Sequence, residues 1–213
     1  MADEKTLNYI VYDLETGGFS KEKHAITEIA MIAINGRTLE EIGRYESFIR
    51  PYASLGYDQQ ALNVTGITME MINSGKDAKV VAKEVSDFIK DTGTGMNKKP
   101  ILCGHNIKKF DNPFLSDFLK FHKKDLWKLI NTEIMDTMWW SRMKTPFDDD
   151  EFGKHNLPDA CSRQGIEVID AHRAMNDTAA NASLVIAYLK SLRGAGESVD
   201  RVEKHNYRDT FKF

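Results

Sequence analysis

Cysteine and proline are scarce in this chain, and it has no long apolar run. The two cysteines, Cys103 and Cys161, are too few for a disulfide framework or a zinc knuckle. Thiols used this sparingly are typical of a reducing compartment, so we expect a cytoplasmic protein. Five prolines and 14 glycines among 213 residues exclude collagen-like and low-complexity sequence. No apolar run approaches the roughly 20 residues of a membrane helix, and residues 1–5 do not resemble a signal peptide. We therefore expect a globular protein without a membrane partner.

Charge of one sign is not in large excess either. Lysines and arginines number 29 against 32 aspartates and glutamates, which gives a net charge of −3 at pH 7. A protein that coats nucleic acid by electrostatic attraction alone is strongly basic, so this balance excludes a histone-like binder. It does not exclude a metal-dependent enzyme that acts on phosphates, because divalent cations held by carboxylates supply the positive charge.

The N-terminal part of the chain carries the pattern of three antiparallel strands. Aromatic and β-branched residues fill 9–12, and a second apolar run covers 26–34. Asn35-Gly36 follows directly and is typical of a tight hairpin turn. We therefore expect a returning strand over 44–50.

Strand and helix patterns alternate in the rest of the chain. We expect helices over 78–89, 113–121, 156–164 and 177–192, a helix through Trp139, and short strands over 100–104 and 132–136. Hairpins followed by alternating helices and strands predict an α/β fold. Its mixed five-stranded sheet would combine an antiparallel meander with parallel strands and be flanked by helices. One domain is expected over residues 1–192, with a tail over 193–213.

A pair of acids ends the first predicted strand. Asp13 and Glu15 are two residues apart, so both carboxylates project from the same face of the strand. Neighbouring carboxylates repel each other unless cations neutralise them, and such hard oxygen ligands suit Mg²⁺ or Mn²⁺. Thr16-Gly17-Gly18 follows and offers bare backbone that a ligand can approach closely. An exposed strand end with a glycine turn is the alternative interpretation.

Two further acids and a histidine complete a set of groups for phosphoryl chemistry. Asp111 follows the fourth predicted strand, where ligands gather in open sheets, although taken alone it is better explained as a cap of the next helix. His172 and Asp177 lead into the last helix, where Asp177 could be a cap and His172 a loop residue. A histidine takes protons from water near neutral pH. Acids and a histidine meeting at one sheet edge would form a two-metal site for phosphoryl transfer.

The three acidic motifs, taken in order, resemble those of the DnaQ-like (DEDDh) 3′-5′ exonucleases of the ribonuclease H-like superfamily. The first motif matches Asp13-Leu14-Glu15-Thr16, the second Asn106 with Phe110-Asp111, and the third His172 followed by Asp177. Between them, Val64-Thr65-Gly66-Ile67-Thr68 resembles a segment that touches the terminal nucleotides in the family. The resemblance spans about residues 8 to 190, and it implies a ribonuclease H-like sheet.

The resemblance also implies roles for individual residues. Asp13, Glu15, Asp111 and Asp177 would hold two Mg²⁺ or Mn²⁺ ions, and His172 would be the general base. The implied substrate contacts are Leu14, Thr16, Gly17, Gly18, Val64, Thr65, Asn106 and Phe110.

The implied reaction is metal-dependent release of nucleoside 5′-monophosphates from the 3′ end of single-stranded DNA or an unpaired 3′ end. Three alternatives stay open: a 3′-5′ exoribonuclease of the same family, a proofreading subunit acting with a DNA polymerase or another replication or repair protein, and an inactive nucleic-acid-binding module. RNA differs from DNA by the 2′-hydroxyl of its sugar, and the sequence does not reveal whether the site accommodates that hydroxyl.

Overall fold

A computed structural model describes residues 6–95, 98–145, 154–168 and 173–198 of the chain. Five strands form one mixed sheet in the order β3-β2-β1-β4-β5. The strands are β1 (Tyr9–Thr16), β2 (Ile26–Ile34), β3 (Glu41–Phe48), β4 (Ile101–Gly104) and β5 (Ile134–Asp136). The first three pair antiparallel, while β4 pairs parallel with β1 and with β5. The predicted meander with added parallel strands is therefore confirmed.

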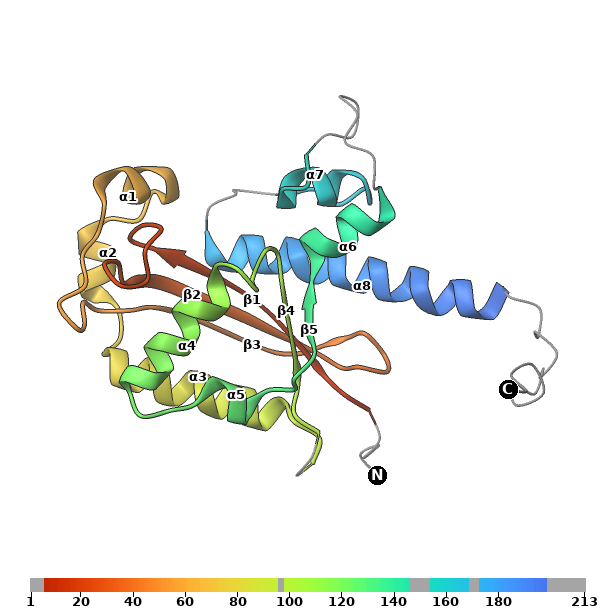
Figure 1. Ribbon diagram of the computed structural model, residues 1–213, viewed down its shortest axis with the longest axis horizontal. Coiled ribbons are helices and arrows are strands. Elements are labelled where there is room, and N and C mark those ends of the chain that lie inside the picture. Colours follow the sequence, from red (N-terminus) through yellow and green to blue (C-terminus); the bar gives the residue numbers. More distant parts are fainter. Residues whose placement is uncertain (1–5, 96–97, 146–153, 169–172, 199–213) are drawn as a thin grey trace, which may run out of the picture.

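Helices cover both faces of this sheet (Figure 1). They are α1 (Gln59–Thr65), α2 (Met69–Ser74), α3 (Ala78–Thr92), α4 (Asp111–Phe121), α5 (Leu126–Leu129), α6 (Thr137–Lys144), α7 (Leu157–Ser162) and α8 (Ala174–Ser198). The short helices α1, α2 and α5 were not predicted, because each has too few residues to show a helical period.

The central strand β1 separates two apolar layers. Tyr12 and Leu14 point into the larger core cluster, which contains α3, α4 and α5. Val11 points to the other face, where it packs against Val185 of α8. Since side chains alternate along a strand, the residues two and four positions beyond Val11 also face the α8 side. These residues are Asp13 and Glu15.

The last helix differs from its predicted bounds at both ends. Helix α8 begins at Ala174 and continues to Ser198 through two glycines, so residues 193–198 of the predicted tail are helical. Arg193 donates hydrogen bonds to the carbonyl oxygens of Gly36 and Arg37 in the β2–β3 hairpin, at 2.6 and 3.1 Å. These bonds offset the roughly 1 kcal/mol that each glycine costs a helix. The remaining tail, residues 199–213, lies outside the described residues, and so does His172.

Among the helices in the described ranges, none combines the length and the apolar character that a membrane span requires.

Candidate active site

Three carboxylates from distant parts of the chain meet beside the end of β1. The carboxylate oxygens of Asp13, Glu15 and Asp177 all lie within 4.8 Å of one another. Asp13 and Glu15 share one face of β1, and Asp177 comes from the first turn of α8. Because α8 begins at Ala174, Asp177 lies inside the helix and is not its cap. The strand and the helix thus bring together three of the four predicted metal ligands.

The fourth predicted ligand, Asp111, approaches the end of the same strand from α4. It is the first residue of α4 and is almost fully buried, at 3% exposure. Its Oδ1 accepts a hydrogen bond from the backbone N–H of Leu14 at 3.2 Å, between the two acids of β1. The next residue, Asn112, accepts a hydrogen bond from the Tyr12 hydroxyl at 2.5 Å. Both side chains therefore tie α4 to β1 and do not cap the helix.

The electrostatics of the cluster are unfavourable for free carboxylates. Burial, and then repulsion by Asp111, Glu15 and other acids, raises the pKa of Asp13 well above its ordinary value. Burial and the neighbouring acids raise the pKa of Glu15 to about 8, and burial raises the pKa of Asp111 to about 7. Asp177 and Glu28 contribute to the shifts at both acids of β1. A bound cation would relieve this repulsion.

The donor set fits a divalent metal ion. Within the described part of the chain, the groups that converge here are carboxylate oxygens, which are the ligands that Mg²⁺ and Mn²⁺ prefer. Both cysteines are buried in other parts of the fold, in two separate apolar clusters. The chemistry of the donors therefore favours a hard cation over zinc or copper.

The loop of the second motif is held by an acid that the sequence analysis did not assign to the site. Asp136, 4% exposed at the end of β5, accepts hydrogen bonds from the backbone N–H groups of Asn106 at 3.0 Å and Lys108 at 3.4 Å. It also accepts one from Met138 at the start of α6, at 3.1 Å. Asn106 itself adopts a left-handed backbone conformation, with φ of 62°. Asp136 therefore orders the loop that leads into Asp111.

His105, next to this loop, is built into the protein interior. Its Nε2 donates to the carbonyl oxygen of His155 at 2.8 Å, and its Nδ1 lies 3.0 Å from the Thr137 hydroxyl. The Thr137 hydroxyl oxygen also lies 2.8 Å from the side-chain Oδ1 of Asn181 in α8. Burial lowers the pKa of His105, which favours the neutral ring. This network links β4, α6 and α8 behind the carboxylates.

The glycines after Glu15 are packed closely by their own chain. A Cβ on Gly17 would lie 2.7 Å from the Tyr57 ring and 2.8 Å from the carbonyl oxygen of Gly56. A Cβ on Gly18, whose φ is +152°, would lie 2.8 Å from the His24 ring. Internal packing thus gives these glycines a role that the sequence did not reveal.

The predicted substrate contacts differ in their exposure. The Leu14 side chain is buried in the core, and the Thr16 hydroxyl donates to the carbonyl oxygen of Gly18 at 2.8 Å. Thr65 is half-buried, and its hydroxyl accepts from the N–H of Ile67 at 3.2 Å. Val64 is 63% exposed. For Leu14 the backbone is therefore the part that a ligand could reach.

Two aromatic rings flank the carboxylates. Phe19 follows the glycines and is 91% exposed, and its ring meets that of Phe110 edge-on at a centroid distance of 6.2 Å. Phe110 packs in turn against Phe114 of α4 at 5.1 Å. Sequence reasoning singled out Phe110 but not Phe19, although its place directly after the first motif was a usable signal.

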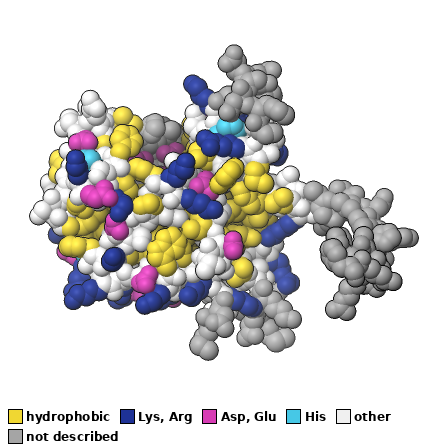
Figure 2. Space-filling view, in the orientation of Figure 1, with side chains coloured by type: hydrophobic (Ala, Val, Ile, Leu, Met, Phe, Trp, Pro, Cys, Tyr) yellow, Lys and Arg dark blue, Asp and Glu magenta, His cyan; other side chains and the backbone are white. Residues whose placement is uncertain are grey.

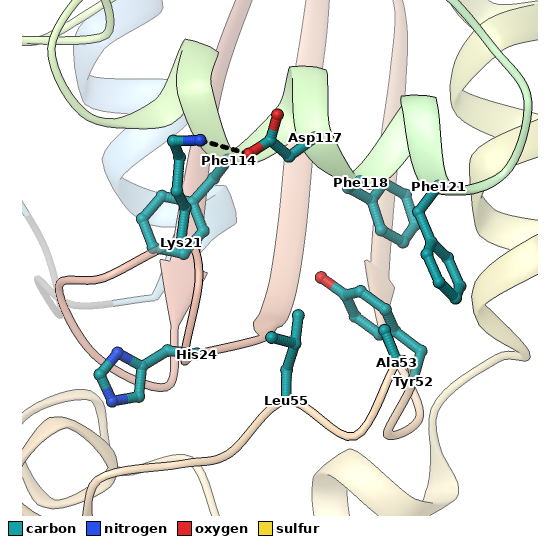
Figure 3. A pocket seen from close by; sticks show the side chains of 9 residues that line it. All are labelled: Lys21, His24, Tyr52, Ala53, Leu55, Phe114, Asp117, Phe118 and Phe121. Atoms are coloured by element: carbon teal, nitrogen blue, oxygen red, sulfur yellow. Dashed lines mark hydrogen bonds and ion pairs between the residues drawn. The ribbon is translucent and has the colours of Figure 1, made fainter.

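A cavity of about 190 Å³ lies next to this aromatic pair, under the loop that follows β1 (Figure 3). Phe118 and Phe121 of α4 form one wall with Tyr52 opposite them. An ion pair between Lys21 and Asp117 crosses from the loop to α4 at its edge. The pair fastens the loop after Glu15 to the helix that begins at Asp111.

The surface around the carboxylates combines both signs of charge. Figure 2 shows acidic side chains on the floor of a hollow between the α1 side and the α7 side of the molecule, with lysine and arginine side chains on its rim. Lys108 and Lys109 are both exposed in the loop that leads into α4. Such a rim favours the approach of a negatively charged ligand in spite of the net charge of −3.

Comparisons with known proteins identify the family of this chain. The model of the exonuclease family matches residues 10–185. The PolC-type DNA polymerase III of Oceanobacillus iheyensis is 34% identical over 177 residues, which are 83% of this chain and 11% of the polymerase. The enzyme of the same name from Bacillus subtilis is 31% identical over 201 residues, 92% of this chain and 12% of the polymerase. The chain thus spans about an eighth or less of the length of these curated relatives.

Solved structures show the same fold. E. coli Exonuclease I in complex with a dT13 oligonucleotide superposes with a TM-score of 0.75 at 19% identity, over 95% of this chain and 46% of that chain. The zinc-bound E. coli Exonuclease I complex with single-stranded DNA gives a TM-score of 0.75 at 18% identity, over 89% and 42% of the two chains.

Proposed function

Because this chain belongs to the exonuclease family, as a member of its DnaQ-like 3′-5′ branch with a ribonuclease H-like fold, we propose that it shortens single-stranded DNA from the 3′ end. The products would be nucleoside 5′-monophosphates, and the reaction would take place in the cytoplasm. The observation that carries this proposal is the convergence of Asp13, Glu15 and Asp177 within 4.8 Å, with Asp111 bonded to the strand between the first two.

The four acids are the groups that would hold the metal ions. Asp13, Glu15, Asp111 and Asp177 would hold two Mg²⁺ or Mn²⁺ ions, which when bound would supply Lewis-acid chemistry at the scissile phosphate. The raised pKa values of Asp13, Glu15 and Asp111 support this assignment, because these carboxylates are costly to ionise without cations. DNA is favoured as the substrate because the curated relatives are DNA polymerases and the solved neighbours bind DNA oligonucleotides.

His172 would take the proton from the attacking water. It directly precedes Arg173, whose successor Ala174 begins the helix that carries Asp177. We expect His172→Ala to lower kcat by about 10²- to 10⁴-fold, the usual contribution of a general base. Metal binding should be unchanged, because the imidazole is not among the ligands.

The pH dependence of kcat tests this role independently. The wild-type rate should rise as the pH passes the ordinary histidine pKa of about 6.5, because the neutral ring is the base. With both proteins measured in saturating Mn²⁺, the residual rate of His172→Ala should lack that rise. A near-wild-type rate in the variant, or a flat wild-type profile from pH 5 to 8, would contradict the assignment.

Phe19 would stack on a base of the bound strand, beside Phe110. Its ring is 91% exposed, so Phe19→Ala should leave the fold intact. We expect the KM for an oligonucleotide to rise about tenfold with little change in kcat, since one base–aromatic stack contributes about 1–3 kcal/mol. Trp127→Ala, which removes a 51% exposed ring from α5, is the matched control. An equal effect of the two variants would refute the stacking role.

A second candidate function is proofreading together with a polymerase. The specific observation in its favour is the 34% identity to part of a PolC-type DNA polymerase III. It predicts that mismatched 3′ ends are removed faster than paired ones and that a polymerase stimulates the reaction.

The decisive experiment uses two 5′-labelled single strands, one of DNA and one of RNA, each incubated with Mg²⁺, Mn²⁺ or EDTA. We expect a metal-dependent ladder that shortens from the 3′ end of the DNA. Asp13→Ala excludes contaminating nucleases. A ladder on RNA alone would identify an exoribonuclease. No ladder on either strand, from a folded protein, would favour the partner-dependent enzyme or the inactive binding module.

A further inference from the structure

A fifth acid lies next to the carboxylate cluster and has no role in the reaction described above. Glu28 is the third residue of β2, directly opposite Glu15 in the antiparallel register, and its side chain is fully buried. Buried carboxylates are costly unless they are paired and hydrogen-bonded. The contacts of Glu28 therefore indicate what this acid does.

The carboxylate of Glu28 holds the beginning of α8. Its Oε1 accepts a hydrogen bond from Arg173 Nη2 at 2.9 Å, and its Oε2 accepts one from Arg173 Nε at 3.3 Å. Oε2 also accepts a bond from the backbone N–H of Ala174, the first residue of the helix, at 3.2 Å. The Arg173 guanidinium lies over the Phe48 ring of β3, 5.3 Å from its centre. One buried acid thus fixes both a side chain and the helix backbone.

This contact lies one helical turn from a predicted metal ligand. The backbone N–H of Asp177 donates to the carbonyl oxygen of Arg173 at 3.0 Å, so the two residues belong to the same turn. Glu28 and Asp177 both repel the acids of β1 electrostatically. Without a cation between the strands and the helix, this repulsion would push the first turn of α8 away from β1. Arg173 is such a cation, because it pairs with Glu28 at the start of α8 and opposes the upward pKa shift of Glu15.

We propose that Glu28 and Arg173 are positioning residues of the active site, which hold the first turn of α8 so that Asp177 reaches Asp13 and Glu15. This inference deepens the proposed function and rests on it, because it concerns the geometry of the same metal site. The bidentate geometry matters, since two parallel bonds set the orientation of the helix start as well as its charge.

The same helix offers a matched control at its far end. Arg193 also ties α8 to the β2 region, through the carbonyl oxygens of Gly36 and Arg37, but it lies more than four helical turns beyond Asp177, at about 3.6 residues per turn. Arg173→Gln and Arg193→Gln each remove one arginine contact between α8 and the sheet. A structural role alone predicts similar losses for both variants, whereas a positioning role predicts a loss of function for Arg173→Gln alone.

The first measurement needs no substrate. Mn²⁺ is titrated calorimetrically into the metal-free full-length chain and its variants. We expect Arg173→Gln to weaken Mn²⁺ binding by about 10- to 100-fold, the usual effect of losing a group that orients metal ligands. Arg193→Gln should bind Mn²⁺ within about twofold of wild type, even if both variants melt at a similar, lower temperature. Equal Mn²⁺ affinities in the two arginine variants would overturn the proposal.

Turnover supplies the second measurement. Arg173→Gln should lower kcat on a 5′-labelled DNA strand by about 10- to 100-fold and leave KM unchanged, and Arg173→Lys should recover only part of the loss because it cannot bind in a bidentate manner. The double variant Glu28→Gln/Arg173→Gln also removes the negative charge of Glu28, which Arg173→Gln leaves without its arginine. Full recovery of kcat in that variant would overturn the positioning role, because charge balance by itself would then explain the loss in Arg173→Gln. If the wild type degrades no strand at all, the proposed function fails, while the Mn²⁺ titration still decides this inference.

Discussion

Replacing Asp13 by asparagine should abolish nuclease activity and at the same time stabilise the metal-free protein. Asp13 belongs to the cluster in which the carboxylate oxygens of Asp13, Glu15 and Asp177 lie within 4.8 Å of one another. An amide keeps the shape of the side chain but removes a charged metal ligand. Since bound metals supply several kcal/mol of transition-state stabilisation and each 1.36 kcal/mol is a factor of ten, we expect kcat to fall by about 10³-fold or more.

The gain in stability follows from the same electrostatics. Burial and four neighbouring acids raise the pKa of Asp13, so its ionised form is unfavourable in the folded state without metal. Asp13→Asn removes this cost, and the metal-free Tm at pH 8 should rise above that of wild type. Asp91→Asn, at an exposed position of α3, is the control and should change neither quantity. An Asp13→Asn enzyme that keeps a tenth of the wild-type kcat would rule out Asp13 as a metal ligand.

The metal-free protein should lose stability as the pH rises from 5.5 to 8.5. The folded state raises the pKa of Glu15 from 4.5 to about 8 and that of Asp111 from 3.8 to about 7. In this range the folded state binds more protons than the unfolded state, so the free energy of unfolding falls with increasing pH. The stabilising contribution is complete below the unfolded pKa values and is lost as the pH passes about 7 and then about 8.

A divalent metal should reverse this trend. Metal ions bind the ionised carboxylates, so binding releases protons and grows stronger with pH. We expect the Tm measured in EDTA to fall steadily between pH 5.5 and 8.5, and the Tm measured in saturating Mn²⁺ to stay level or rise. Glu15→Gln should flatten the EDTA profile. A wild-type Tm in EDTA that rises across this range would show that these carboxylates are not the dominant titrating groups.

Much of the site could be predicted from local sequence. The spacing of Asp13 and Glu15 put both acids on one strand face, because side chains alternate along any strand. The predicted strands and most of the longer helices are present, since their apolar periods are strong. Taken alone, Asp111 and Asp177 were better explained by the local sequence as helix caps. Only the packing of α4 and α8 against β1 showed that both carboxylates reach the strand instead.

Other features had no local signal. Glu28 lies inside a nine-residue strand in which every side chain is buried, and nothing in its neighbours predicts that it bonds a residue 145 positions away. Asp136 reads as an ordinary helix cap, yet it also orders the loop of Asn106. The glycines after Glu15 were interpreted as open backbone, whereas Tyr57 and His24 pack directly against them.

The sequence by itself determined which groups are available, the face of β1 that carries the two acids, and the family to which the chain belongs, because these depend on residue type, period and motif order. The tertiary structure decided the distances between acids that lie more than 160 residues apart, and it decided that Arg173 pairs with Glu28. Those distances depend on how two layers of helices pack onto one sheet. Contacts between residues so far apart in the sequence produce no periodic pattern of residue types from which they could be predicted.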